Sequence, residues 1–434
     1  MARFESFNSG YVAPKALSVM DTLIARHTGE LSIAIHTLST NVLSYSEKLS
    51  DTFDEQQVQY ALEVLKIAGL IRRDLMAFEE KTRDRLRILM GRVSAAIEEE
   101  CNVRAATSSN TWSQVPDSLS AAEIEAILAM MVCRDENDNE GLTKSPSILV
   151  LQRLVSPDKV GKKVALFPES MVSVSRLVRS CQSFVFDICA AVPMKHLDGM
   201  SMLPVWRQEE SLWSSTPDSY GTLPQSHITQ VGEHMLALVQ ALEPFASDKN
   251  ALMLANQVME GVEHVSMKSW KSFIDAISCD DITKKEDIIE LMKGVTFKEL
   301  VIHQDASQGL EEEEDLQDEA GENAEMHAFC NKWLDAVCTA VTGKLLDRTM
   351  RIQYLSRKGC DHLSVDYNYI INVFSALGVL GHPHPILSHI AQVYKLEAET
   401  ARDRIASLSL KEQSVTVQIM SKMESRITEM RGSR

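Results

Sequence analysis

The sequence predicts an all-α protein, an elongated stack of antiparallel helical bundles that forms a rod with no significant β-sheet. Proline (12) and glycine (18) are scarce in a chain of 434 residues, whereas strand-rich and loop-rich folds need many turn-forming residues. Apolar residues recur at intervals of three and four along most of the chain, which is the spacing of a helix face. Long helices joined by short loops are typical of stacked bundles.

The first 200 residues are expected to form an N-terminal helical bundle. Apolar side chains at helical spacing predict a helix over Lys15–Ser44. Thr52 and Glu55 have the spacing of a capping box and open a second, longer helix. Polar segments at 102–117 and 134–146 predict loops. Further helices are expected at 120–133, 147–155 and 168–192.

A connector containing proline and tryptophan is expected at residues 201–224. The stretch Pro193–Pro224 holds four prolines together with Trp206 and Trp213. Proline removes a backbone donor and interrupts helices, so we predict a hinge between two helix-rich regions. The tryptophans are expected to pack locally rather than to bind a ligand.

The remaining chain predicts a middle bundle at 225–304, an acidic disordered loop at 305–323 and a C-terminal bundle at 324–434. Glu311–Glu325 holds nine acidic residues and no basic one, so it has almost no apolar surface with which to fold. Trp333 lies on the apolar stripe of the first helix of the last bundle. The expected helices are 225–242, 249–263, 268–277, 284–293, 324–354, 366–378, 386–408 and 410–430.

Charge and cysteine usage argue against several classes of protein, although a linear sequence leaves basic patches assembled by folding open. The net charge is −17, and no basic block suggests nucleic-acid binding or a polybasic membrane segment. Eight cysteines without a C-x-x-C pair predict reduced thiols in the core. Residues 1–14 contain no apolar signal core, and the longest strongly apolar run, Ala126–Cys133, is too short to span a bilayer. Any membrane association is therefore expected to be peripheral.

The sequence offers no catalytic, cofactor-binding or metal site. His382, His384 and His389 lack cysteine or carboxylate partners at ligand spacing, so we interpret them as surface histidines of a turn. Asp280 and Asp281 lack the third carboxylate of a diphosphate-binding magnesium site. Phosphate-binding loops, dinucleotide fingerprints, nucleophile elbows and H-E-x-x-H pairs are also missing. These features predict a protein that is not an enzyme.

Two amphipathic segments carry a family resemblance. Ile228–Phe245 reads I-T-Q-V-G-E-H-M-L-A-L-V-Q-A-L-E-P-F and Asp366–Val379 reads D-Y-N-Y-I-I-N-V-F-S-A-L-G-V. Both resemble segments in the C-terminal half of the conserved oligomeric Golgi complex subunit 7 family. His234 of this chain stands where that family has an aromatic residue. Asn331, Trp333 and Leu334 are similar to the start of the intervening family helix. The residues singled out as family-motif or interface positions are Asp366, Tyr369, Asn372, Glu243, Pro244, Phe245 and Trp333.

The resemblance implies a subunit of a Golgi vesicle-tethering complex that acts by protein–protein interaction in retrograde intra-Golgi transport and in retention of glycosylation enzymes. It implies binding to subunits 5, 6 and 8, and to SNAREs and Rab GTPases, at the cytosolic face of the Golgi membrane. Nucleic acid is not an expected partner. Family members are longer at the N-terminus, so the chain is expected to lack an assembly segment there.

Two other classes remain open at the level of sequence: a helical tether or scaffold of another trafficking complex, such as an exocyst-like assembly, and a helical enzyme. An enzyme should show a concave pocket with convergent polar groups, whereas a tether should expose apolar helical grooves. Tyr369 and Asn372 lie three residues apart and share one helix face. They fit either a half-buried seam that binds a partner or a core helix whose polar groups are satisfied internally.

Overall fold

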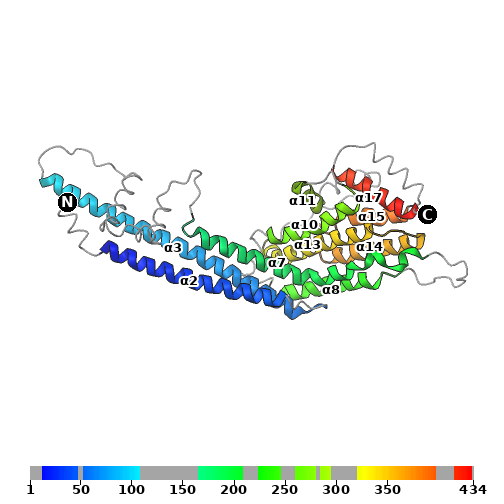
Figure 1. The fold of residues 1–434 in the computed structure, drawn as a ribbon, viewed down its shortest axis with the longest axis horizontal. Coiled ribbons are helices and arrows are strands. Elements are labelled where there is room, and N and C mark those ends of the chain that lie inside the picture. The colour runs from blue at the N-terminus through cyan, green and yellow to red at the C-terminus, as the bar shows by residue number, and fades with distance from the viewer. Residues whose placement is uncertain are drawn as a thin grey trace, which may run out of the picture. The chain divides into compact units, whose positions relative to one another are not determined.

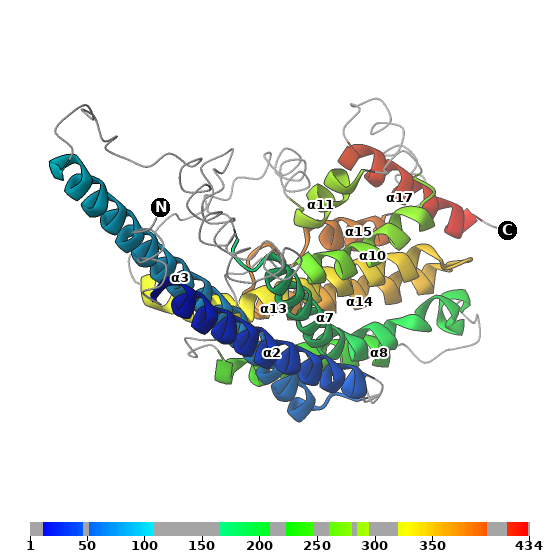
Figure 2. The same cartoon turned by 60° about the vertical axis from the view of Figure 1, so that its left-hand side comes forward.

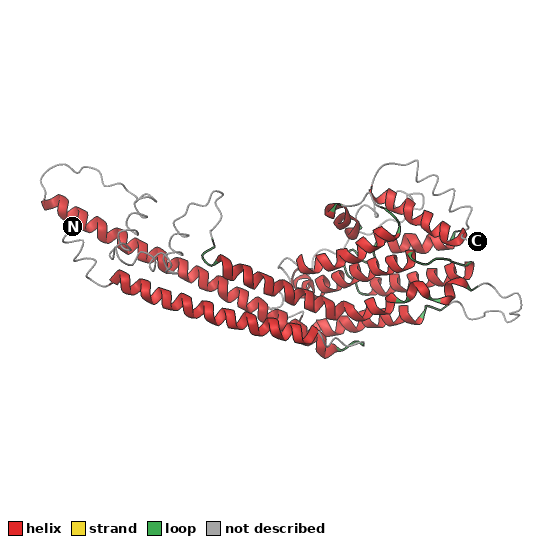
Figure 3. Ribbon diagram, in the orientation of Figure 1, coloured by secondary structure: helices red, strands yellow, loops and turns green. Residues whose placement is uncertain are grey.

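All regular elements in the described part of the chain are helical, which confirms the all-α prediction (Figure 3). The computed structural model describes residues 12–46, 52–107, 165–208, 223–245, 260–279, 284–294, 320–396 and 415–432. Figure 1 labels the helices. They are α2 (Val12–Ser46), α3 (Glu55–Thr107), α7 (Pro168–Asp198), α8 (Ser226–Leu242), α10 (Glu260–Ala276), α11 (Lys285–Lys293), α13 (Ala320–Met350), α14 (Arg357–Ala376), α15 (Pro385–Lys395) and α17 (Val415–Gly432), with the 3₁₀ turns η1 (Met200–Met202), η2 (Pro204–Arg207) and η3 (Glu243–Phe245).

The chain divides into two compact units. The first comprises Met1–Asn41 and Ile67–Val178, and the second comprises Val42–Lys66 and Arg179–Arg434. The second unit therefore takes in both the middle and the C-terminal regions named from the sequence. The domain boundaries at residues 200, 224, 304 and 323, and the hinge, stay predictions.

Aromatic and aliphatic side chains from α2, α3 and the start of α7 form the core of the first unit. The ring of His27 stacks on Phe78 with centroids 3.8 Å apart, and Phe78 lies 5.4 Å from Phe167. Leu75 and Leu166 are almost completely buried. These contacts use the apolar positions that recur at helical spacing in α2 and α3.

In the second unit α10 packs along α13, as Figures 1 and 2 both show. The indole nitrogen of Trp270 donates to the carbonyl of Thr339 at 2.9 Å. Its ring lies on Gly343, where a Cβ would come within 2.7 Å of Trp270 Cδ1. From Cys330 to Met350 most side chains of α13 are buried, as expected of a helix packed on several sides.

Two arginines of α17 cap the C-terminal ends of two other helices, α13 and α15. The C-terminal carbonyls of a helix have no partner within it. Arg426 donates from Nε to the carbonyl of Met350 at 3.1 Å, at the end of α13. Arg431 donates to carbonyls at the end of α15, those of Val393, Tyr394 and Leu396. Guanidinium groups carry five donors in a fixed fork, which suits this multiple capping.

The helix expected at 168–192 is longer than predicted, because α7 continues through Pro193 to Asp198. A proline inside a helix leaves the carbonyl four residues earlier without its usual N–H donor. Here that carbonyl belongs to Cys189, and Nε2 of His234 lies 2.7 Å from it. A carbonyl only accepts, so the ring must donate and thereby replaces the lost hydrogen bond. Trp206, buried in η2, donates to the carbonyl of Met200 at 2.6 Å, so its expected local packing is confirmed.

Several other helix ends differ from the sequence prediction. The helix α3 runs to Thr107, beyond the expected loop start at residue 102, and α13 begins at Ala320, inside the expected disordered loop. The helix α14 begins at Arg357 because Ser356 caps it and accepts the N–H of Gly359 at 3.0 Å. The rest of the acidic loop, Trp213, Asp280, Asp281 and the helices expected at 120–133 and 147–155 lie outside the described residues.

One stretch of the described chain, Pro168–Arg207, is long and apolar enough to cross a membrane by composition alone. Searching the sequence for unbroken apolar runs missed it, because Asp187 and Lys195 interrupt the stretch. Of its most apolar window, 67% is buried inside the protein. Buried core helices pass the same test, so this helix is a weak indication of a membrane span.

Candidate functional site

The two motif segments form α8 and α14, and these helices pack against one another. The ring of Tyr369 lies directly on Gly232. A Cβ at Gly232 would be 2.7 Å from both Cε1 and Oη of Tyr369, so the missing side chain lets α14 approach α8 closely. We call this contact, with Gln225, Gly232, Asp366 and Tyr369, the α8–α14 seam.

Asp366 anchors the start of α8 from the neighbouring helix. Its side chain is fully buried, and Oδ1 accepts the backbone N–H of Gln225 at 2.7 Å. Gln225 is the N-cap residue of α8 and makes no capping bond with its own side chain. Burial raises the pKa of Asp366 to about 7, although the bond from Gln225 acts in the opposite direction. Asp366 of α14 thus provides the side-chain oxygen that caps the N-terminus of α8.

His234 holds α8 on its other side. Burial lowers its pKa to about 4, so the ring is neutral near pH 7 and donates to Cys189 on α7. Phe53 approaches the same ring edge-on, with centroids 4.9 Å apart. The sequence signal for the role of His234 was Pro193, the residue that frees the Cys189 carbonyl.

The structure separates the seven candidate interface residues into buried and exposed groups. Trp333, Phe245 and Asp366 are buried, Tyr369 is half-buried, and Asn372, Glu243 and Pro244 are exposed. Only the exposed face of the seam is therefore open to a partner. One turn beyond Gly232 on α8, Leu236 is 47% exposed, although it is a large apolar residue. Sequence reasoning missed Leu236 as a surface residue because it lies within an apolar run.

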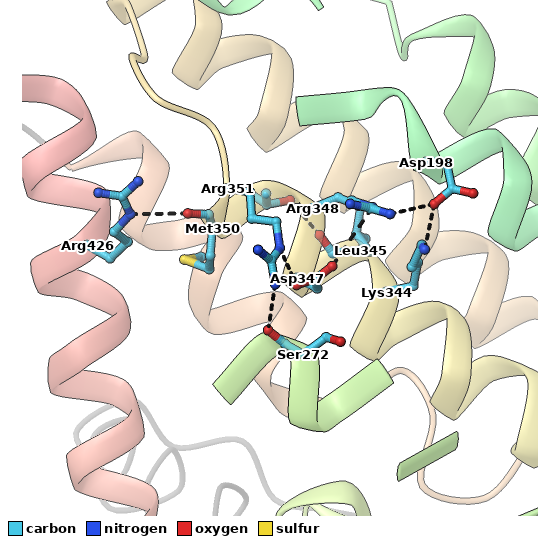
Figure 4. Close-up of polar contacts among 10 residues, drawn as sticks. Asp198, Ser272, Lys344, Leu345, Asp347, Arg348, Met350, Arg351 and Arg426 are labelled. Carbon is cyan, nitrogen blue, oxygen red and sulfur yellow. Dashed lines mark hydrogen bonds and ion pairs between the residues drawn. The ribbon is translucent and has the colours of Figure 1, made fainter. Parts of the chain in front are cut away.

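A polar cluster at the C-terminal end of α13 joins this helix to α7 (Figure 4). Lys344 and Arg348, one turn apart, both approach Oδ1 of Asp198 at 2.6 Å. Partial burial by itself would raise the pKa of Asp198, but the two cations outweigh it and lower the pKa below its ordinary value. The carboxylate is therefore ionised and held by two helix-borne cations, an arrangement suited to joining helices.

The same cluster reaches α10 and α17. Arg351 pairs with Asp347 at 2.7 Å and also donates to the carbonyl of Ser272 at 3.3 Å (Figure 4). Arg426 of α17 donates to Met350. Basic side chains thus bind carboxylates and backbone carbonyls and so connect four helices, α7, α10, α13 and α17. We interpret this cluster as a set of polar contacts that stabilises the packing of these helices.

The turn histidines make separate hydrogen bonds, and the prediction that all three are surface residues is wrong. His384 and His389 are buried. His384 Nε2 faces the carbonyl of Leu291 at 3.0 Å while Nδ1 accepts the N–H of Ile386 at 3.2 Å. His389 pairs with Glu424 at 2.8 Å, and His382 with Asp335 at 2.9 Å. Each ring contacts a partner far away in the sequence, so the local sequence does not show these hydrogen bonds.

Within the described ranges, no group of three or more His, Cys, Asp or Glu side chains could hold a metal ion. Six cysteines of the described chain are free and buried: Cys181, Cys189, Cys279, Cys330, Cys338 and Cys360. Burial raises the pKa of Cys181 and Cys189 to about 12, so these thiols are protonated at neutral pH. Thiolates, not thiols, act as nucleophiles. The α8–α14 seam is buried at Gly232 and Asp366, and the exposed side chains of Leu236 and Asn372 border it.

The described helices and the packing of α8 against α14 define a helical bundle protein. The family Golgi complex component 7 (COG7) matches residues 1–272. The chain belongs to this family, which confirms the resemblance seen in its sequence. The match includes Ile228–Phe245 and ends before Trp333.

A relative with a curated name is the "Conserved oligomeric Golgi complex subunit 7" of Arabidopsis thaliana, which is 24% identical over 212 residues. The aligned stretch covers 49% of this chain and 18% of that protein. The alignment thus spans less than a fifth of the relative's length. No solved structure matches the chain.

Proposed function

We propose that this chain is a subunit of a Golgi vesicle-tethering complex that acts by binding other proteins, not by catalysis. Membership of the Golgi complex component 7 family carries this proposal. The process would be retrograde transport within the Golgi, and hence retention of glycosylation enzymes. The partners would be subunits 5, 6 and 8 of the complex, together with SNAREs and Rab GTPases. The chain would lie on the cytosolic face of the Golgi membrane as a peripheral protein.

The exposed face of the α8–α14 seam is the surface that we assign to subunit binding. Leu236 offers apolar surface one turn from Gly232, and Asn372 offers an exposed amide one turn from Tyr369. Residues three and four apart share a helix face, so both extend the seam outward. An apolar side chain bordered by polar groups is the usual composition of an interface. The internal partners of Asp366 and Tyr369 hold this face in place.

Co-purification from cells tests the function and the surface separately. The tagged chain, extended by any upstream coding sequence, should retrieve subunits 5, 6 and 8. The double variant Leu236→Ser/Asn372→Ala should retrieve them at least about tenfold less, because a few central residues dominate interface energy. Both changes are at exposed positions, so the melting temperature should stay within a few degrees of the parent value.

Gln230→Ala/Gln392→Ala is the matched control, since both glutamines are exposed, on α8 and α15. It should leave retrieval unchanged. Full retrieval by the Leu236/Asn372 variant would move the contact to another surface and leave the function standing. Failure of the parent chain to retrieve any Golgi tethering subunit would contradict the function itself.

A further inference from the structure

Folding gathers basic side chains at the start of α14 that are far apart in sequence. Arg207 of η2 donates to Oε1 of Gln353 at 3.3 Å, across 146 residues of chain. The N–H of Ser356 donates to the carbonyl of Trp206 at 2.8 Å. Ser356 precedes Arg357 and Lys358, the first two residues of α14. Arg207, Arg357 and Lys358 thus form one group, which we call the basic surface.

The basic surface is unfavourable for the fold that carries it. A helix N-terminus has a partial positive charge, so cations there cost stability and acidic residues would favour it. The first turn of α14 nevertheless contains Arg357 and Lys358 and no acidic residue. Within the described chain the three cations form no ion pair, and Asp361 on the next turn is exposed. Local choices that oppose stability are expected at functional sites.

Two exposed apolar side chains flank the basic surface. Met202 is 83% exposed and lies in η1, directly before the η2 turn that carries Arg207. Leu223 is 75% exposed and lies two residues before Gln225. The side-chain nitrogen Nε2 of Gln225 lies 3.1 Å from Nδ1 of His362. His362 is one turn beyond Lys358 on α14. Positive charge and projecting apolar side chains therefore lie at the same end of the second unit.

We propose that the basic surface binds the anionic headgroups of a membrane, with Met202 and Leu223 entering the interfacial region. Cations bordering anionic lipid combined with inserted apolar groups form the usual peripheral attachment to a bilayer. An acidic protein segment would satisfy the charges but would not require two exposed apolar side chains beside them. The inference rests on the proposed peripheral role and adds a direct contact between this subunit and lipid.

Vesicle sedimentation with the purified full chain tests the proposal. Vesicles of phosphatidylcholine containing phosphatidylserine should bind the chain, and phosphatidylcholine alone should bind it far less. Each cation near an anionic surface strengthens binding roughly fivefold, so Arg207→Gln/Arg357→Gln should weaken it by about 25-fold. Met202→Ser/Leu223→Ser should also weaken it, whereas higher salt should weaken only the electrostatic part.

Lys285→Gln/Lys293→Gln is the matched control, because it removes two exposed cations from α11 and changes the net charge equally. It should bind as the parent does. Equal binding to vesicles with and without phosphatidylserine, or an equal loss in the control, would overturn the proposal. So would binding of an acidic peptide with the sequence of residues 311–325 without any binding to vesicles. The assay needs no other subunit, so its outcome is independent of the co-purification result.

Discussion

The carboxyl group of Asp366 is buried on α14, and its protonation follows from that position. One oxygen accepts a backbone N–H, while Oδ2 has no hydrogen-bond partner in the described structure. Removal from water disfavours the charged form and raises the pKa to about 7, from an ordinary value of about 3.8. The folded state therefore holds this proton more tightly than the unfolded chain. Its contribution to stability is present at low pH and is lost as the pH rises from about 4 through about 7.

Asp366→Asn should stabilise the protein at pH 8 and have little effect at pH 4.5. Asparagine keeps an oxygen acceptor for the N–H of Gln225 but never ionises. At pH 8 the gain should be on the order of 1–3 kcal/mol, less than the full shift implies, because the new amide N–H₂ is buried. Urea denaturation at both pH values measures it. Asp361→Asn, an exposed carboxylate on the same helix, is the control, and an equal effect there would refute the assignment.

Sequence reasoning found Asp366 and Tyr369 as motif residues but could not assign their environments. The bond from Gln225 to Asp366 joins residues 141 apart in the chain, and helical spacing carries no information about such pairs. His384 shows the same limit, because its partner Leu291 is 93 residues away. Trp333, in contrast, lies on an apolar stripe at regular spacing and is buried as that stripe indicates.

At the scale of helices, the close approach of α8 and α14 depends on Gly232. Gly232→Ala would place a Cβ within 2.7 Å of the Tyr369 ring. Alanine favours a helix by about 1 kcal/mol over glycine, but overpacking costs typically 1–3 kcal/mol, so we expect net destabilisation. Tyr369→Leu should relieve most of that cost in the Gly232→Ala background. A double-mutant cycle in urea measures the coupling, and additive effects would show that the two residues do not touch.

Helix positions were predictable where local signals mark both ends. The helix α11 was expected to start at Lys284 and starts at Lys285, and it ends at Lys293 as expected, before Gly294 in the left-handed region with φ 66°. The end of α7 was not predictable, because the hydrogen bond that carries it past Pro193 comes from His234 in another helix. The arginines of α17 likewise satisfy α13 and α15 from a distance. Local sequence shows which helix ends need partners but not which residues supply them.

At the scale of the whole molecule, composition and periodicity were sufficient to predict the all-α class. The motif in α8 was sufficient to predict the family. Charge was less predictable. The chain has a net charge of −17 and no basic run, yet Arg207 meets the start of α14 through backbone contacts made only after folding. A linear reading of charge therefore misses surfaces that combine single cations from separate elements.

Buried histidines give the whole fold a predictable response to acid. Burial lowers the pKa of His227, His234 and His384 to about 4, with further contributions from neighbouring groups. Each therefore adds stability that is fully present above the unfolded pKa of about 6.5 and is lost as the pH falls toward about 4. Asp366 acts in the opposite direction over the same range, and burial also raises the pKa of Asp187. Three strongly shifted histidines outweigh these two carboxyls, so acid should destabilise the protein.

We expect a melting temperature at pH 5 that is at least several degrees below that at pH 7. His234→Gln/His384→Gln removes two of the titrating groups while leaving polar side chains beside the Cys189 and Leu291 carbonyls. This variant should be less stable at pH 7 but should lose less stability between pH 7 and pH 5. His36→Gln, at an exposed position of α2, should retain the full dependence. A parent protein that melts higher at pH 5 than at pH 7 would show that carboxyl groups, not buried histidines, dominate the response to acid.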